Sequence, residues 1–291
     1  MLSKSSPLDI LPCSLLKSCA HVYSPAIARL ANLSLQTGKF PARYKRAQVL
    51  PLLKKAGLDS LQPANYRPVS NLSTVSKVLG RLVLARLRPH LLSSANFSQF
   101  QSANRKGHST ETALLEVLDS VFMAADDKQV TVLIGLDLSA AFDTVDHRLL
   151  LDRLRLEFGV TEIPLRWLQS YLEGRTQFIK MGQHESHATE VDVGVPQGSV
   201  LGPLLFAVYC SPIADVIAHH GVQYHQYADD TQLHLAMRAD NTPAGLSVLA
   251  ECTTDVRQWY LQNGLQLNPD KSAACGDVIC VRGRSRPASS R

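Results

Sequence analysis

Three aspartates stand in two stretches whose pattern suits a divalent-metal site. Asp137 comes near the end of an almost continuous apolar run at residues 130–138, and Asp229 and Asp230 stand together between two segments of alternating polarity. Carboxylates gathered at the rim of a sheet are costly unless a cation compensates their charge. Two hard divalent cations about 3.5 to 4 Å apart can activate an attacking hydroxyl and neutralise a leaving pyrophosphate. The three residues therefore predict a metal site suited to phosphoryl transfer.

Two more aspartates, Asp143 and Asp146, follow shortly after the first stretch. They flank a turn that leads into an expected helix at residues 147–158, where a carboxylate can accept backbone N–H bonds. We interpret both as caps rather than as metal ligands.

The segments around the three carboxylates predict strands. Residues 130–138 are apolar and follow a polar Asp-Asp-Lys turn, which favours a central strand. Residues 221–227 and 231–237 alternate in the manner of a hairpin, with the Ala-Asp-Asp at 228–230 as its turn.

Basic residues are interleaved with aromatic and apolar ones between residues 39 and 55. Charge alone favours a solvated edge strand over residues 47–55, whereas the same mixture is typical of a surface that follows a nucleic-acid backbone. Arg67 precedes a proline and is expected in a turn at residues 65–72. A helix with one apolar stripe should follow over residues 75–88 and stop at Pro89.

A polar loop at residues 98–109 precedes a predicted helix. Ser109 or Thr110 can cap this helix, and an apolar stripe supplies its buried face. Arg105 and Lys106 stand beside a glycine just ahead of the helix, where they could receive phosphate oxygens, although such a sequence is also common in simple turns. The residues expected on the buried face are Ala113, Leu114, Val117, Leu118, Val121 and Phe122.

The rest of the chain alternates helices with short strands. Two helices are expected within residues 8–35, broken by Pro12 and Pro25, and a long amphipathic helix should span residues 243–262 and end at Gly264. Residues 265–271 should form a short strand and turn. The remaining expectations are a helix at 164–172, a strand at 176–181, a Gly-Pro-Gly loop at 191–199 and an apolar helix at 200–218.

Composition sets broader bounds. The 291 residues are 45% hydrophobic, which is enough for one large domain or two lobes and excludes a disordered chain. A net charge of +5, concentrated in local basic patches, suits a polyanionic partner. The six cysteines lack metal-site spacing and are expected to be reduced thiols. With no apparent leader and no long uninterrupted apolar run, we expect an intracellular protein of the nucleus or cytoplasm, neither secreted nor bound to membranes.

Taken together, the motifs resemble those of the reverse transcriptase domain of a non-LTR (LINE-type) retrotransposon, over residues 8 to 271. They occur in the family's order. The matching features are Arg67 in Asn-Tyr-Arg-Pro, the Arg-Lys-Gly-His-Ser-Thr-Glu-Thr stretch at 105–112, Asp137 with the Ala-Phe-Asp at 141–143, the Gly-Val-Pro-Gln-Gly-Ser loop at 194–199 and the Tyr-Ala-Asp-Asp box at 227–230.

The resemblance implies an α+β right-hand polymerase fold in which the palm has an antiparallel sheet backed by helices. Fingers and palm would be interleaved over residues 37–271, after a helical extension at 1–36 and before a divergent, disordered tail at 272–291. The thumb would be absent or truncated. The implied activity is that of an RNA-directed DNA polymerase, with an RNA template, a DNA primer and deoxynucleoside triphosphates as partners.

The resemblance also assigns catalytic roles. Asp137 and Asp229 would hold two Mg²⁺ ions, with Mn²⁺ as the alternative metal, and Asp230 would complete the metal site and support it electrostatically. Lys271 would donate a proton to the departing pyrophosphate, although an exposed lysine after Pro-Asp is an equally simple interpretation.

Five more residues would contact the substrate. Arg105, with Lys106 beside it, would pair with the triphosphate. Phe142 would lie under the incoming sugar and reject a 2′-hydroxyl, with an ordinary core aromatic as the alternative. Gln197 and Gly198 would let the backbone pass close to the nascent base pair, because a side chain at 198 would obstruct it.

Some features depart from the family pattern. Ala103-Asn104 stands where a small residue and an aromatic are usual, and the sequence after Lys271 does not continue into the usual apolar strand. No endonuclease segment precedes residue 8, so the chain resembles a piece of a longer element. A catalytically inactive nucleic-acid-binding relic is therefore the alternative function, and an RNA-templated RNA polymerase is a third, which Phe142 disfavours.

Overall fold

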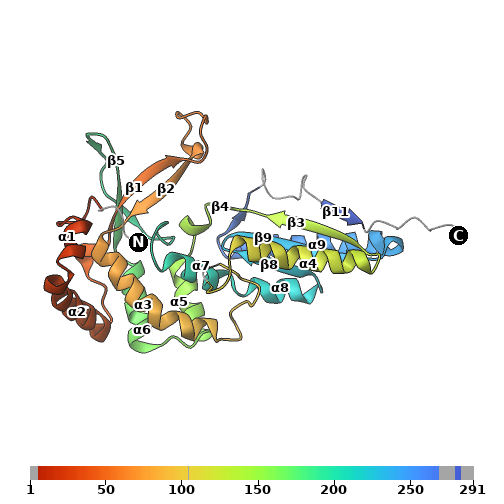
Figure 1. Ribbon diagram of the computed structural model, residues 1–291, viewed down its shortest axis with the longest axis horizontal. Helices are drawn as coiled ribbons and strands as arrows, with labels where there is room; N and C mark the ends of the chain where they lie inside the picture. Colours follow the sequence, from red (N-terminus) through yellow and green to blue (C-terminus); the bar gives the residue numbers. More distant parts are fainter. Residues whose placement is uncertain (1–5, 104, 269–278, 283–291) are drawn as a thin grey trace. The chain divides into compact units, whose positions relative to one another are not determined.

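The computed structural model describes residues 6–103, 105–268 and 279–282 of the chain, the last four by their backbone alone (Figure 1). The chain divides into two compact units, each built from two separate segments. The first unit comprises residues 1–94 and 142–209, and the second comprises residues 95–141 and 210–291. Of the two arrangements that composition allowed, the chain adopts two lobes.

The second unit is built on a four-stranded antiparallel sheet with the order β11-β3-β9-β8. Its main strands are β3 (Val130–Leu136), β8 (Gln223–Tyr227) and β9 (Asp230–Met237). The predicted central strand is confirmed, because β3 pairs on both sides and buries Val130, Val132 and Leu136.

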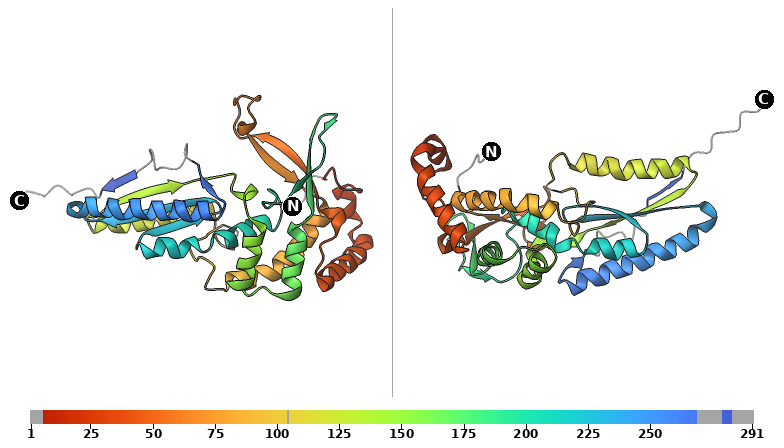
Figure 2. Two further views of the ribbon diagram at one scale, coloured as in Figure 1. Left: turned by 180° about the vertical axis from the view of Figure 1, so that it is seen from behind. Right: turned by 90° about the horizontal axis from the view of Figure 1, so that it is seen from below.

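Helices cover both faces of this sheet, as Figure 2 shows. α4 (Thr110–Asp126) packs on β3 and β8, and α8 (Ile213–His219) and α9 (Thr242–Gln262) lie together on the opposite face. Ser109 caps α4 in a reciprocal capping box with Thr112, as the sequence predicted. Of the expected buried face, Leu114, Leu118 and Phe122 are instead exposed.

Three short strands, β4, β10 and β11, complete the pairing in the described part of this unit. β4 (Leu138–Ser139) pairs antiparallel with β10 (Gln266–Leu267), which follows α9. β11 (Ile279–Arg282) pairs with β3, so this part of the expected disordered tail is a strand. The prediction for the tail was wrong there because it considered local composition, whereas the backbone of β3 offers an edge for pairing; the rest of the tail lies outside the described residues.

The first unit contains a mixed sheet with the order β2-β1-β5-β6, in which β1 and β5 run parallel and β7 also pairs with β5. β1 pairs with β5 only over residues 46–49, so the prediction of a solvated edge strand was wrong for its buried first half, whereas residues 50–53 pair with β2 alone and are mostly exposed, as predicted. Arg67 belongs to a strand rather than to a turn. The strands are β1 (Arg46–Leu53), β2 (Tyr66–Asn71), β5 (Arg175–Met181), β6 (His184–Glu185) and β7 (Thr189–Val191).

Helices supply the core of the first unit, with Leu150, Leu154, Trp167 and Leu168 almost fully buried. The helices are α1 (Cys13–Ser18), α2 (Ala20–Thr37), α3 (Thr74–Leu92), α5 (His147–Leu156) and α6 (Glu162–Leu172), with α7 (Gly202–Cys210) at the end of the second segment. Short 3-10 turns occupy Ala42–Tyr44, Pro63–Asn65, Ala141–Asp143 and, in the second unit, Ala239–Asn241.

Proline positions did not predict all the helix ends. Two N-terminal helices are present as expected, but they are separated at Cys19, and Pro25 lies inside α2. Pro89 lies inside α3, which continues to Leu92 because Leu91 is fully buried and favours another turn. The expected helix over 200–218 is two helices, with a break at Ser211-Pro212.

The helical stretch 202–219 is the one segment of the described residues that is long and apolar enough to cross a membrane, judged by length and composition alone. Most of it is buried inside the protein, as is usual for core helices of soluble proteins, so it is weak evidence for a membrane span.

Candidate active site

The hairpin formed by β8 and β9 carries Asp229 and Asp230 at its tip. The predicted hairpin is confirmed, but Tyr227 pairs with Asp230, so the turn has two residues, Ala228 and Asp229, and Asp230 already belongs to β9. Ala228 adopts φ 58°, the left-handed region that costs an alanine free energy and that hairpin turns usually give to glycine. Both its N–H and its carbonyl oxygen are hydrogen-bonded to the Gln101 side chain.

The strand register brings the third aspartate to the same end of the sheet. Leu136 pairs with Thr231, so the next position along β3 is Asp137 and the preceding position along β9 is Asp230. Asp137 and Asp229 are half-buried, and Asp230 is exposed. The three aspartates thus belong to neighbouring strand ends within one unit.

Asp137 has a specific partner in Asn268, which directly follows β10. The Asn268 backbone N–H donates to the Asp137 carbonyl oxygen at 2.8 Å, and its side-chain Nδ2 donates to Asp137 Oδ2 at 3.1 Å. Reasoning from sequence missed this residue. The sequence indicated Asn268 only through its position in the predicted strand and turn at residues 265–271. Lys271, at the end of that segment, lies outside the described residues.

The three aspartates have the right ligand atoms for a divalent cation, but their side chains are not arranged around a common point. Carboxylate oxygens are the ligands that Mg²⁺ prefers, and the backbone brings three aspartates to one strand end. Within the described residues, however, no three His, Cys, Asp or Glu side chains form a group that could hold a metal ion. The donor set is therefore suitable, while the side chains do not stand as an assembled ligand cluster.

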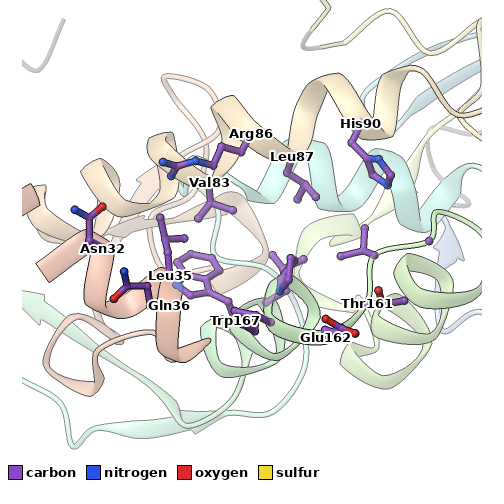
Figure 3. A pocket seen from close by; sticks show the side chains of 15 residues that line it. Asn32, Leu35, Gln36, Val83, Arg86, Leu87, His90, Thr161, Glu162 and Trp167 are labelled. Atoms are coloured by element: carbon purple, nitrogen blue, oxygen red, sulfur yellow. The ribbon is translucent and has the colours of Figure 1, made fainter. Parts of the chain in front are cut away.

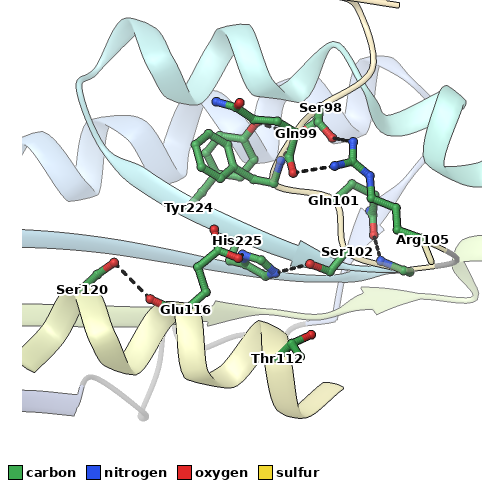
Figure 4. Close-up of polar contacts among 12 residues, drawn as sticks. Ser98, Gln99, Gln101, Ser102, Arg105, Thr112, Glu116, Ser120, Tyr224 and His225 are labelled. Atoms are coloured by element: carbon green, nitrogen blue, oxygen red, sulfur yellow. Dashed lines mark hydrogen bonds and ion pairs between the residues drawn. The ribbon is translucent and has the colours of Figure 1, made fainter. Parts of the chain in front are cut away.

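Arg105 lies in the loop before α4 with its guanidinium turned back onto that loop (Figure 4). Nη2 donates to the Ser98 carbonyl oxygen at 2.9 Å, and Nη1 donates to the Gln99 carbonyl oxygen at 3.0 Å. The guanidinium also lies over the Phe97 ring, and its burial lowers the pKa of Arg105. Lys106, by contrast, is exposed. Arg105 thus braces its loop, and Lys106 is the more accessible cation.

Phe142 belongs to the first unit, where its ring stacks on Phe206 at 4.8 Å between centroids. Its carbonyl oxygen accepts a hydrogen bond from the backbone N–H of Val195 at 2.7 Å, which ties it to the Gly-Pro-Gly loop. Phe142 is half-buried, so part of it packs in the core and part remains accessible to solvent.

The Gly-Pro-Gly loop requires its glycines for reasons within the fold. Gly194 has φ 84°, and a Cβ there would lie 2.8 Å from the Asp143 carbonyl oxygen. Gly198 has φ 93°, and its Cβ would lie 3.1 Å from the Ser70 carbonyl oxygen. The Gln197 carbonyl oxygen accepts from the Ser70 N–H at 2.8 Å, so this loop is attached to β2.

The two aspartates interpreted as caps differ in their contacts. Asp146 Oδ1 accepts a hydrogen bond from the Leu149 N–H at 2.9 Å and caps α5, as predicted. Asp143 is not a cap, because its Oδ2 accepts from Gln197 Nε2 at 3.3 Å. Asp143 also lines a cavity of about 470 Å³ next to this loop, and desolvation by neighbouring atoms raises the pKa of its carboxyl group although the residue keeps contact with solvent.

A separate cavity of about 720 Å³ lies among α2, α3 and α6 in the first unit. Figure 3 shows Leu35, Val83, Leu87 and Trp167 around it, with Arg86 and His90 also on its lining. None of the residues predicted for the active site lines this cavity. It is a mainly apolar space and does not contribute to the arrangement of the carboxylates.

Comparison with known proteins identifies the family. The model of the family described as reverse transcriptase (RNA-dependent DNA polymerase) matches residues 53–281. The chain belongs to this family. It is related to the reverse transcriptases of non-LTR retrotransposons, as the motifs predicted.

Among the relatives are two retrotransposon proteins of Drosophila melanogaster. The chain is 30% identical over 276 residues to the probable RNA-directed DNA polymerase from transposon BS, covering 93% of this chain and 30% of that protein. It is 31% identical over 255 residues to the RNA-directed DNA polymerase from mobile element jockey, covering 85% of this chain and 27% of the relative. The chain therefore spans less than a third of the length of these relatives.

A solved structure has the same type of fold. Apo telomerase from Candida tropicalis, truncated from its C-terminal domain, is similar with a TM-score of 0.57 at 13% identity, over 84% of this chain and 52% of that chain. The likeness confirms the α+β class of reverse transcriptases, with mixed sheets and helices.

Proposed function

We propose that this reverse transcriptase domain adds deoxynucleotides to a primer 3′-hydroxyl by two-metal phosphoryl transfer. The second unit would be the palm, and the mixed sheet of the first unit would belong to the fingers. The observation that carries this proposal is the strand register that brings Asp137 to the hairpin tip with Asp229 and Asp230.

The three aspartates would hold two Mg²⁺ ions, or Mn²⁺ in their place. Asp137 and Asp229 would be the principal ligands, and Asp230 would complete the site and add negative charge beside it. Bound ions of this kind activate the attacking hydroxyl and neutralise the leaving pyrophosphate. Asn268 would orient the Asp137 carboxylate for metal binding through the hydrogen bond from Nδ2.

The remaining site residues would contact the incoming nucleotide. The Phe142 ring, supported by Phe206, would meet the sugar and disfavour a 2′-hydroxyl. Gln197 and Gly198 would follow the nascent base pair. Lys106 would approach the triphosphate. Arg105 would either order the loop that carries both residues or turn outward and also pair with the triphosphate. Lys271 would supply a proton to the pyrophosphate.

The nucleic-acid partners would be an RNA template and a DNA primer. Exposed Lys54, Lys55 and Arg67 at the end of the β1–β2 pair offer positive charge for a phosphate backbone. Such partners imply an intracellular location, in the nucleus or the cytoplasm.

An assay that measures binding and incorporation side by side tests the proposal. The protein would be given an RNA template with a DNA primer, then deoxynucleotides or ribonucleotides in separate reactions with Mg²⁺. The proposal predicts extension with deoxynucleotides only. Binding that weakens with salt but leads to no incorporation would instead support an inactive nucleic-acid-binding relic, and ready use of ribonucleotides would support an RNA polymerase.

A further inference from the structure

Gln101 is a buried polar residue that the proposed mechanism does not use. It lies in the loop before α4 and is only 2% exposed (Figure 4). Its Oε1 accepts a hydrogen bond from the Ala228 N–H at 2.9 Å, and its Nε2 donates to the Ala228 carbonyl oxygen at 3.1 Å. One side-chain amide therefore binds both backbone polar groups of the first residue of the hairpin turn.

Ala228 is the residue of the hairpin turn that most needs support. Its φ of 58° is disfavoured for an alanine, and such conformations persist where the surroundings fix them. Asp229 follows it directly, so the direction of that side chain depends on the conformation of Ala228. The Gln101 amide supplies contacts that stabilise this conformation through both the N–H and the carbonyl oxygen of Ala228.

The position of Gln101 is fixed independently of its side chain. The Gln226 N–H donates to the Phe100 carbonyl oxygen at 2.9 Å, and the Ser102 N–H donates to the Gln226 carbonyl oxygen at 2.9 Å. This forms a parallel bridge between Gln101 and Gln226, alongside the edge strand β8. Gln101 Oε1 also accepts from the Ala103 N–H at 3.1 Å. The two bonds to Gln226 thus hold the backbone around Gln101 beside the turn, and a side-chain substitution leaves them in place.

We infer that Gln101 is a positioning residue that fixes the Ala228 turn and thereby aims the Asp229 and Asp230 carboxylates. It would act through Ala228 rather than by contact with metal or substrate, and its catalytic consequence rests on the proposed polymerase function. Loss of its amide would leave both backbone groups of Ala228 without these partners and let the turn leave the left-handed conformation.

The test uses Gln101→Met, which keeps the length of the side chain and removes its two hydrogen bonds to Ala228 along with the one to Ala103. Gln99→Met is the matched control, because Gln99 is an exposed glutamine in the same loop. We expect Gln101→Met to lower kcat for primer extension by about tenfold or more, as substitution of residues that orient metal ligands typically does. The affinity for primer–template should change little, the Tm should fall by a few degrees because buried backbone groups lose their partners, and Gln99→Met should behave as wild type.

A second substitution distinguishes positioning from general damage. Glycine adopts positive φ freely, so Ala228→Gly in the Gln101→Met background should recover part of the lost kcat. A Gln101→Met variant with wild-type kcat would overturn the inference, as would a double variant no more active than Gln101→Met.

Amide hydrogen exchange at residues 227–230 gives a readout that does not depend on catalysis. The Ala228 N–H should exchange slowly in the wild type and faster in Gln101→Met. If the wild type incorporates no nucleotide, the proposed function fails, and the exchange measurement still decides whether Gln101 holds the turn. Equal exchange in both proteins would refute the contact itself.

Discussion

Gly194 in the Gly-Pro-Gly loop provides a sharp test of the fold around Phe142. An alanine there would place its Cβ 2.8 Å from the carbonyl oxygen and 2.9 Å from the Cα of Asp143, which are backbone atoms that cannot rotate away. The same residue also has φ 84°. Gly57 offers a matched control, since it has φ 85° but no atom within 4 Å of the position that an alanine Cβ would occupy.

The comparison separates two costs. Gly57→Ala incurs only the cost of a positive φ, about 1 kcal/mol in the free energy of unfolding. Gly194→Ala incurs the same cost plus that of overpacking, about 1–3 kcal/mol. The expected losses are therefore about 1 kcal/mol for Gly57→Ala and about 2–4 kcal/mol for Gly194→Ala.

Urea unfolding followed by circular dichroism measures both losses. In proteins of this size, 1 kcal/mol corresponds to about 2–4 °C in Tm, so thermal scans provide a second measurement. Equal destabilisation by the two substitutions would refute the close approach of the loop to Asp143. A larger loss for Gly57→Ala would refute it more strongly.

Three further predictions concern single side chains. Asn268→Ala should raise the Mg²⁺ concentration needed for half-maximal extension by about tenfold, because it removes a bond to a proposed ligand; an unchanged Mg²⁺ titration would contradict this role. Burial lowers the pKa of His234 below its usual value of about 6.5, so protonation favours the unfolded state and the free energy of unfolding should fall as the pH drops below that value. His234→Leu should reduce this fall in urea unfolding over the same pH range. An unchanged pH dependence of the free energy of unfolding would contradict this prediction. Asp146→Ala should cost about 1 kcal/mol by removing a helix cap, whereas Thr161→Ala at the start of α6, where no side-chain cap bond forms, should cost less in the same assay.

Local patterns predicted much of the scaffold around the candidate site. The apolar run that became β3, the alternating segments of the β8–β9 hairpin and the capping box at Ser109 all depend on neighbours a few residues away. Such interactions are visible in sequence because period and capping chemistry are local. The aspartates could therefore be assigned to strand ends from the sequence alone.

Contacts between distant segments could not be predicted in this way. Gln101 and Ala228 are 127 positions apart, and Asn268 and Asp137 are 131 positions apart. No local pattern marks such pairs. The same limitation explains why Pro89 was expected to end α3, since the burial of Leu91 that favours another turn depends on the tertiary packing.

The most direct test of the central claim is primer extension by Asp229→Asn beside wild type and Asp240→Asn. Asp240 is an exposed aspartate of the same unit that pairs with Arg238, so its substitution controls for the loss of one negative charge. Our account predicts Mg²⁺-dependent extension on an RNA template by wild type and by Asp240→Asn, and none by Asp229→Asn despite normal primer–template binding. Full extension by Asp229→Asn would contradict it.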